Sequence, residues 1–254
     1  MKRFLKVAAP LLFWLGVWAL AAWRMNSPLL LPAPGKVLLS LWTLAGSGAF
    51  WKITGMSLLR VLGGLVLSVV VGVLLAAATE RFSAVRALFS PLLSVIRATP
   101  VASFIILAIL WMGRDVVPVF IVILMALPVV WGNVCAGIRT TDRGLLQMAK
   151  IYQFPLMRRL RRVWIPSVMP HFLSGVRTAL GLAWKAGVAA EVLTVPKVSI
   201  GKMLMDTKLN LEVEEMFAWT IVVILLSFAI EGGLLALLNK AGMACNERGG
   251  KDHD

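Results

Sequence analysis

Residues 139–166, RTTDRGLLQMAKIYQFPLMRRLRRVWIP, form a strongly basic segment between long apolar runs. Arg158, Arg159, Arg161 and Arg162 are clustered near its end, and the pair Ile165-Pro166 closes it. We call residues 139–166 the basic loop. Cationic segments between apolar runs are typical of the loops that connect membrane spans.

The rest of the chain has the composition of a membrane protein. Of its 254 residues, 59% are hydrophobic and 15% charged, and the mean hydropathy is +0.87. A helix that crosses the hydrocarbon needs about 20 mainly apolar residues, because its backbone amides must be satisfied internally. The sequence predicts an all-α membrane protein, one transmembrane domain over residues 1–254, with six transmembrane helices. Their apolar runs are 7–23, 61–78, 98–113 (expected to begin before Arg97), 116–138, 167–194 and 217–238.

Lysine and arginine positions set the expected orientation. Fifteen of them fall on the side of the N-terminus and seven on the other side, and cytoplasmic loops retain these residues. We therefore expect both termini, the basic loop and a polar tail at 241–254 to be cytoplasmic. Lys2, Arg3 and Lys6 before an apolar run also fit a cleaved secretion signal, but the length of that run and the even number of spans favour a retained helix.

The charge distribution and the absence of known motifs argue against nucleic-acid binding and against catalysis by this chain. The net charge of +14 flanks apolar spans instead of covering a soluble surface, so we expect no nucleic acid partner. The chain has no Gly-x-x-x-x-Gly-Lys-Ser/Thr, Gly-x-Ser-x-Gly or His-Glu-x-x-His motif. We therefore assign no catalytic residue, no metal ligand and no bound cofactor, and Cys135 and Cys245 receive no disulfide.

Small residues recur every four positions in two of the predicted spans. Such stripes let a second helix approach closely, although glycine and alanine are also common in membrane helices. Prolines in and beside the third and fourth spans predict kinks. The stripes are Gly64, Ser68, Gly72 and Ala76, and Gly175, Ala179, Ala183 and Gly187; the prolines are Pro91, Pro100, Pro118 and Pro128.

Two short amphipathic helices are predicted outside the spans. Residues 36–45 follow a proline-rich turn and are expected to lie at the outer interface, with Trp42 and Trp51 as anchors. Residues 145–154, LLQMAKIYQF, place polar side chains at a three-residue spacing. Pro155 is expected to end this second helix, and Ile165-Pro166 to begin the fifth span.

The basic loop resembles the cytoplasmic coupling loop of ATP-binding-cassette importer permeases. That pattern runs Glu-Ala-Ala, three residues, Gly, and later an apolar residue with Pro. Here Gln147-Met148-Ala149 occupy the triplet, Gln153 the glycine position and Ile165-Pro166 the terminal pair. The chain departs from the pattern at Gln147, which lacks the acidic charge, and at Gln153.

Other segments are similar to the nitrate, sulfonate and taurine branch of these permeases, over roughly residues 30–240. The resemblance implies the type I importer fold in the cell (inner) membrane. The segments are Leu31-Pro32-Ala33-Pro34, Ser57-Leu58-Leu59-Arg60-Val61-Leu62-Gly63-Gly64, Trp111-Met112-Gly113, and Ala179-Leu180-Gly181-Leu182-Ala183-Trp184 leading to Ala190-Glu191.

The resemblance also implies partners. The chain would act with a second permease copy, expected to form a homodimer, with two cytoplasmic ATP-binding subunits that use ATP and Mg, and with an extracytoplasmic solute-binding protein. The solute would be small, such as a sulfonate, nitrate or vitamin precursor. The implied ATPase-coupling residues are Gln147, Met148, Ala149, Lys150, Tyr152, Gln153, Phe154, Pro155 and Pro166.

Charged residues inside apolar spans must face protein or water. Arg177, Lys185 and Glu191 in the fifth span are candidates for the substrate pathway, where the cations would suit an anionic solute. They equally fit structural ion pairs, including pairs with Glu231. The mixed-charge segment 196–215 is either a docking surface for a binding protein or a solvated loop.

Three alternatives remain open from the sequence. The helix at 145–154 could be held at the membrane surface by anionic lipid. The chain could be a self-contained secondary transporter or channel, driven by an ion gradient through Lys185, Glu191 and Glu231. It could also be a membrane anchor without a pathway.

Overall fold

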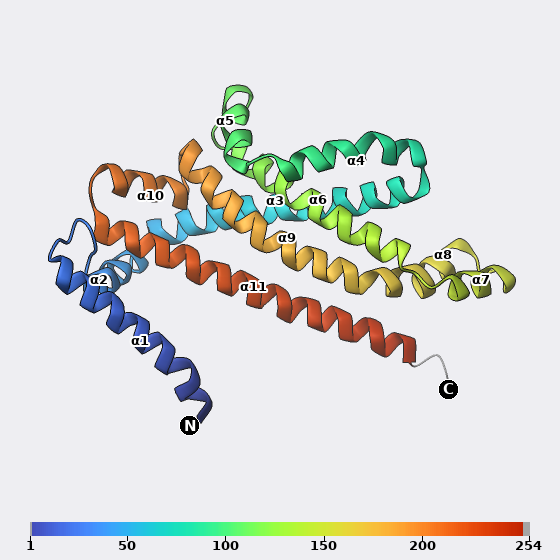
Figure 1. The fold of residues 1–254 in the computed structure, drawn as a ribbon, viewed down its shortest axis with the longest axis horizontal. Helices are drawn as coiled ribbons and strands as arrows, with labels where there is room; N and C mark the ends of the chain where they lie inside the picture. The colour runs from blue at the N-terminus through green and yellow to red at the C-terminus, as the bar shows by residue number, and fades with distance from the viewer. Residues whose placement is uncertain (1, 251–254) are drawn as a thin grey trace.

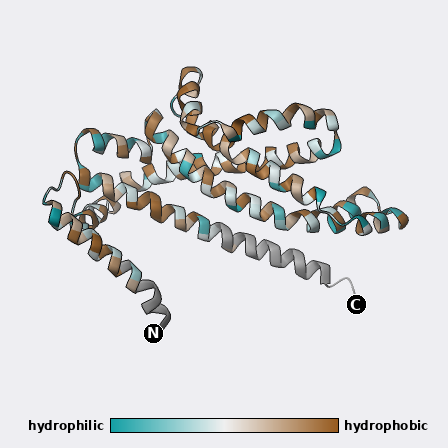
Figure 2. Cartoon of the chain, in the orientation of Figure 1, coloured by the Kyte–Doolittle hydropathy of each residue, from teal (hydrophilic) through white to brown (hydrophobic). Residues whose placement is uncertain are grey.

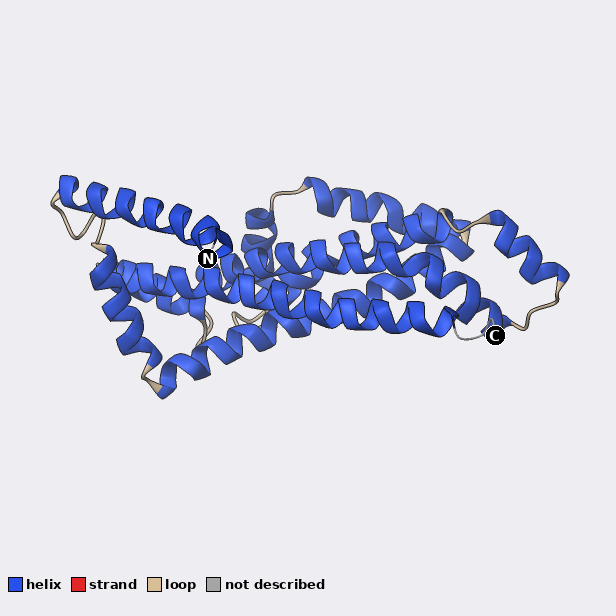
Figure 3. Cartoon of the chain, turned by 90° about the horizontal axis from the view of Figure 1, so that it is seen from below, coloured by secondary structure: helices blue, strands red, loops and turns tan. Residues whose placement is uncertain are grey.

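The structure is a computed structural model that describes the backbone of residues 2–250 and the side chains of residues 9–233 (except residue 11) and 236. Helices joined by short connections make up the described chain, and no strand occurs in it (Figures 1 and 3). The predicted all-α class is confirmed. Figure 1 shows an elongated molecule with α7 and α8 at one end of the long axis and α2 and α10 at the other.

The core is a bundle of three helices, α3 (Gly48–Arg81), α6 (Val117–Arg139) and α9 (Ile165–Thr194). Both predicted stripes of small residues are buried in it, and they pack against α6. A Cβ atom built on Gly72 would lie 3.0 Å from Val130, and one built on Gly187 would lie 2.7 Å from Val61. The stripes therefore allow the close approach that the sequence predicted.

Two neighbouring glycines of α3 give a matched test of this packing. A methyl group at Gly64 would come within 2.8 Å of Val122 Cγ1 and 3.1 Å of the Val119 carbonyl oxygen, whereas Gly63 has nothing within 4 Å. We expect Gly64→Ala to destabilise the helical core by about 1–3 kcal/mol through overpacking. Gly63→Ala should be neutral or stabilise by up to about 1 kcal/mol. Thermal unfolding of the two variants in detergent checks the difference, and equal stabilities would contradict the packing.

Four further helices have one end at the α2 end of this bundle, and α11 runs back along the bundle from there (Figure 1). They are α1 (Lys2–Met25), α2 (Pro34–Ala45), α10 (Ile200–Leu209) and α11 (Val213–Gly250). Trp219 of α11 is buried against Phe50, with ring centroids 5.2 Å apart. Helix α2 confirms the predicted helix at 36–45, and its Trp42 is 81% exposed, as an interface anchor requires.

Three helical segments are long and apolar enough to cross a membrane, Gly48–Arg81, Val117–Arg139 and Val213–Gly233, judged over the described residues. The pair of α4 (Ser83–Ala98) and α5 (Val101–Trp111) makes a fourth if it is one bent span. The predicted runs at 7–23 and 167–194 lie in α1 and α9. Hydrophobic residues run along these helices, and hydrophilic residues gather at α7 and α8 (Figure 2).

The predicted third span is not one straight helix. The run 98–113 was expected to begin before Arg97, but α4 and α5 meet at an angle of 108°. Pro100, the N-cap of α5, disfavours a helical conformation at Thr99, which is extended with ψ 133°. Arg97 at the end of α4 donates a hydrogen bond to the Pro128 carbonyl and lies 5.6 Å from the Trp131 ring. The break thus places Arg97 against α6.

The start of the fifth span also differs from prediction. Helix α8 (Leu156–Arg159) and the π-helical turn η1 (Leu160–Trp164) lead directly into α9, so the helix begins at Leu156 and not at Ile165. The ring of Pro166 would clash with the carbonyl four residues earlier in a regular α-helix, and a wider π turn relieves that clash. The arginine cluster is therefore helical. At the other end of the chain α11 continues to Gly250, and residues 251–254 of the predicted tail 241–254 lie outside the described residues.

Candidate functional site

Helix α7 (Arg143–Ile151) is closed at both ends by local hydrogen bonds. The Asp142 carboxylate caps its start by accepting a bond from Gly144 N at 2.6 Å. At its end, Phe154 N donates to Ala149 O at 2.9 Å and Gln153 N donates to Lys150 O at 3.1 Å. These two bonds form a Schellman motif, in which the residue after the C-cap adopts a left-handed conformation. That residue is Gln153, with φ 50°.

The left-handed backbone explains why the resemblance places a glycine at this position. A residue with a Cβ atom pays about 1–2 kcal/mol there, whereas glycine does not. We expect Gln153→Gly to stabilise the turn by about 1 kcal/mol. Gln147→Gly, inside the same helix, should destabilise it by about 1 kcal/mol. Hydrogen exchange of the α7 amides measures both, and slower exchange in Gln147→Gly than in Gln153→Gly would contradict this account.

The side chains of α7 and of its C-cap differ in exposure: one is buried against the protein, and most of the others are exposed. Ala149 is 1% exposed and faces the protein, where α7 packs against η1. Met148 is 41% exposed, Ile151 77% and Tyr152 70%. We call these three residues the exposed edge of α7. Of the other residues predicted for coupling, Gln147, Lys150, Gln153, Pro155 and Pro166 are exposed, and Phe154 is half-buried. Most of the predicted set is therefore accessible in the basic loop, and Ala149 is buried.

A polar cluster fixes the helix ends beside the basic loop. Glu80 of α3 forms ion pairs with Arg86 of α4 and with Arg139 of α6, the latter at 2.9 Å. Trp131 Nε1 donates to Thr79 Oγ1 at 3.0 Å. Because three helices share these contacts, this end of the bundle can transmit movement as one unit.

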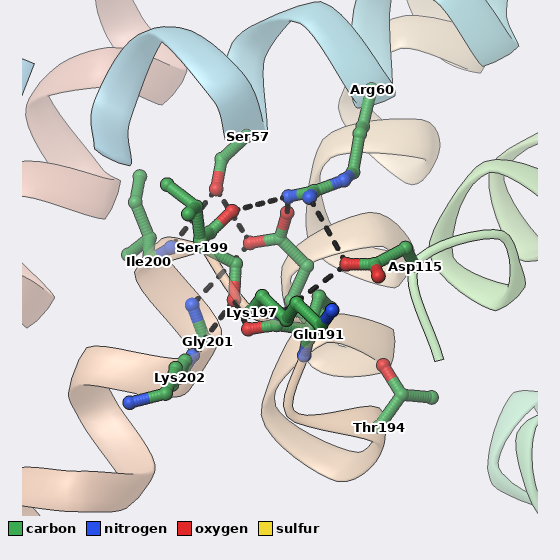
Figure 4. Close-up of polar contacts among 12 residues, drawn as sticks. Ser57, Arg60, Asp115, Glu191, Thr194, Lys197, Ser199, Ile200, Gly201 and Lys202 are labelled. Carbon is green, nitrogen blue, oxygen red and sulfur yellow. Dashed lines mark hydrogen bonds and ion pairs between the residues drawn. The ribbon is translucent and has the colours of Figure 1, made fainter. Parts of the chain in front are cut away.

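At the opposite end, Glu191 joins α9, α3 and α10 (Figure 4). Its carboxylate is fully buried and accepts hydrogen bonds from Ser57 Oγ at 2.7 Å and Gly201 N at 3.3 Å. Arg60 Nη1 lies 3.3 Å from its other oxygen and donates to Val198 O at 2.6 Å. Several polar partners compensate the desolvation of this carboxylate.

The start of α10 is built around the same carboxylate. Ile200 N donates to Ser57 Oγ at 2.9 Å, and Ser199 caps the helix by accepting from Lys202 N at 3.0 Å. A Cβ atom on Gly201 would lie 2.3 Å from the Glu191 carbonyl carbon, so only glycine fits there. The segment Ser199-Ile200-Gly201 is thus a tightly packed turn.

The structure separates the three residues predicted for a substrate pathway. Glu191 faces inward, and its contacts favour the structural alternative. Arg177 lies 3.6 Å from Glu231 of α11 in a pair that is half exposed. Lys185 is exposed on α9 and has no ion pair or hydrogen bond among the described residues. It shares that face of α9 with Ser174, Thr178 and Ala189.

The comparisons agree with this architecture. Residues 68–240 match the family model described as "Binding-protein-dependent transport system inner membrane component". The chain belongs to this family. It is a membrane-embedded permease subunit of an ATP-binding-cassette transport system, and systems of this kind work with binding proteins and ATPases.

Relatives of the permease are transport permeases named for several solutes. It is 30% identical to an aliphatic sulfonates transport permease protein of Escherichia coli (strain K12), over 92% of this chain and 88% of that one. It is 28% identical to the taurine transport system permease protein of the same strain, over 87% and 82%. A formylaminopyrimidine transport permease protein of Halalkalibacterium halodurans is 28% identical over 76% and 78%.

One solved structure supports the fold. The crystal structure of an amino acid ABC transporter with histidines matches with a TM-score of 0.55 and 16% identity, over 76% of this permease and 90% of that chain. The resemblance to the nitrate, sulfonate and taurine branch and the expected type I permease fold are confirmed.

The sequence analysis did not identify Ser57 as a partner of Glu191, nor Asp115 as a second partner of Arg60. Ser57 was quoted within a motif but given no contact, and Asp115, whose carboxylate lies 3.4 Å from Arg60 Nη2, was not singled out. Ser57 and Arg60 are three residues apart on α3 and so lie on one helix face. That spacing was the available signal, whereas nothing local connects either residue to position 191.

Proposed function

We propose that this permease acts as a pair in the inner membrane, with both termini cytoplasmic, and imports a small anionic organic solute. ATP hydrolysis by two cytoplasmic subunits, which use ATP and Mg, supplies the energy, and α7 is the element they hold. The observation that carries this proposal is the exposed edge of α7, where no element among the described residues covers Met148, Ile151 and Tyr152. Apolar residues gathered on a short projecting helix are typical of a docking surface.

The contacts around α7 would let it move as a rigid lever that displaces the helix connected to it. Its cap at Asp142 and its Schellman motif fix its ends, and Ala149 anchors it on η1. Since η1 continues into α9 without a break, a displacement of α7 reaches a core helix of the bundle directly. The departure from the family pattern at Gln153 leaves this geometry intact, because Gln153 adopts the left-handed turn that the glycine would take.

The exposed face of α9 is the proposed wall of the solute pathway. Its Ser174, Thr178 and Ala189 are small or polar, whereas exposed residues of α3 such as Val66 and Leu74 are apolar. Lys185 on this face would be costly against lipid and is stable beside water or an anion. Arg177 would contribute little positive potential to the pathway, because Glu231 already pairs with it.

A sulfonate or carboxylate solute fits this wall, and the names of the sulfonate and taurine relatives point to the same class. The opposite end would receive the binding protein. There, α10, the link to α11 and the start of α11 carry charged residues of both signs; Lys208 and Glu212 are exposed, and Lys202, Asp206, Glu214 and Glu215 are partly buried.

Photocrosslinking tests the docking step. A photoreactive amino acid at Gln147, on α7, should capture the co-expressed ATPase subunit in native membranes, and the same residue at Leu209 on α10 should not. Capture of lipid alone at Gln147 would contradict the proposal, because it would mean that α7 lies on the membrane surface.

A further inference from the structure

A large groove runs beside the bundle at the α7 end. It has a volume of about 1070 Å³ and lies between α3 and the continuous helix of α8, η1 and α9. Val73, Ala77 and Phe172 are among the many apolar residues that line it. The volume is at the upper end of the range for ligand sites, about 300–1,000 Å³.

The mouth of the groove is basic. Arg81 at the end of α3 and Arg159 of α8 both line it. The Nε atom of Arg159 is buried and has no hydrogen-bond partner, and no ion pair joins either arginine to a carboxylate within the described residues. Glu80, which also lines the groove, is already paired with Arg86 and Arg139. The mouth therefore offers positive charge that no described carboxylate of the chain compensates.

The length of the groove matches one leaflet of a bilayer. Its wall on α3 extends from Val69 to Phe82, about 20 Å at 1.5 Å per residue. Half of the hydrocarbon core of a bilayer is about 15 Å thick. An occupant with apolar chains in the groove and an anionic group at the arginines would thus lie at the depth of a lipid in one leaflet.

A second copy of this chain is a poorer fit. Of the described carboxylates, those at the α7 end are Glu80 and Asp142, and both already accept hydrogen bonds within their own chain. A helix from the described part of another copy would therefore cover Arg81 and Arg159 without pairing them, which is costly.

We propose that this groove binds one anionic phospholipid of the cytoplasmic leaflet, with its acyl chains along Val73, Ala77 and Phe172 and its phosphate at Arg81 and Arg159. The proposal rests on the proposed orientation of the permease, and it is independent of which solute is carried. A lipid held there would fill the space between α3 and the segment that leads from α7 into α9. The bound lipid would thereby stabilise the position of that segment relative to α3.

Native mass spectrometry of the full-length permease with its partner subunits tests this. The complex is titrated with phosphatidylglycerol or with phosphatidylcholine of the same acyl chains. We expect one tightly retained phosphatidylglycerol per permease. Arg159→Gln should weaken its binding about fivefold, which is the contribution of one basic residue near an anionic surface, and should leave phosphatidylcholine unaffected. Ala77→Trp should weaken both lipids by filling the groove.

Arg143→Gln is the matched control, because Arg143 is an exposed arginine at the same end that does not line the groove. It should bind phosphatidylglycerol as the wild type does. Equal retention of the two lipids by the wild type, or equal losses in Arg159→Gln and Arg143→Gln, would overturn the proposal. Crosslinking from position 77 to a second permease in place of lipid would overturn it as well. Lipid retention is read without transport, so failure of the importer mechanism would leave this result interpretable.

Discussion

Glu191→Ala is expected to destabilise the permease by about 3–5 kcal/mol, the range for a buried ion pair that loses one partner. Arg60 would stay 11% exposed and lose its nearest buried carboxylate. The amide of Gly201 and the hydroxyl of Ser57 would lose their acceptor as well. Because these groups come from α3 and α10, the contacts between these helices at the α10 end of the bundle should weaken together.

Thermal unfolding in detergent, with hydrogen exchange of α10, measures this loss. Glu191→Gln keeps an acceptor for Ser57 and should lose less than Glu191→Ala. The double variant Arg60→Met with Glu191→Met removes both charges and should recover much of the lost stability. A Glu191→Ala protein as stable as the wild type, with unchanged exchange in α10, would show that the network does not hold this end together.

Tyr152→Ala is expected to weaken docking of the ATPase about thirtyfold or more, and to reduce ATP-driven uptake accordingly. Buried aromatic residues at interfaces commonly contribute at least about 2 kcal/mol when truncated, which corresponds to about thirtyfold in affinity. Tyr152 is 70% exposed and makes no side-chain hydrogen bond within the described chain, so its truncation should leave the fold unchanged. The affinity of the purified ATPase for the permease in nanodiscs measures the effect.

Leu88→Ala is a suitable control for this experiment. Leu88 lies on α4, is 69% exposed and is absent from the basic loop. Its truncation should change neither docking nor uptake. If Tyr152→Ala docks as tightly as Leu88→Ala, the exposed edge of α7 is not the contact surface.

Periodic features of the fold were predictable from the sequence. The stripe from Gly64 to Ala76 repeats every four residues, and this spacing alone places it on one helix face. The short helix at 145–154 was also predicted, although the observed α7 spans Arg143–Ile151. Its end differs because Gln153 adopts a left-handed conformation, which residue type alone did not indicate.

The direction in which a helix continues, and the contacts between segments far apart in the chain, were not predictable from the sequence. The run 98–113 is apolar throughout, and apolarity does not encode the 108° bend at Thr99-Pro100. The helix through Arg158 to Arg162 was missed because Pro166 normally marks a helix start, whereas here a π turn accommodates it. Glu191 was recognised as a buried charge, but its partners come from segments far apart in the chain and are brought together only by the fold.

Reconstituted uptake tests the central claim, that a separate ATPase drives this permease through α7. Proteoliposomes containing the permease, the ATPase and the binding protein are loaded with ATP, and uptake of a radiolabelled sulfonate is followed with and without an imposed ion gradient. We predict uptake that requires ATP and the ATPase, is lost in Tyr152→Ala and is indifferent to the gradient. Gradient-driven uptake by this chain alone would contradict the account and would identify a self-contained secondary transporter.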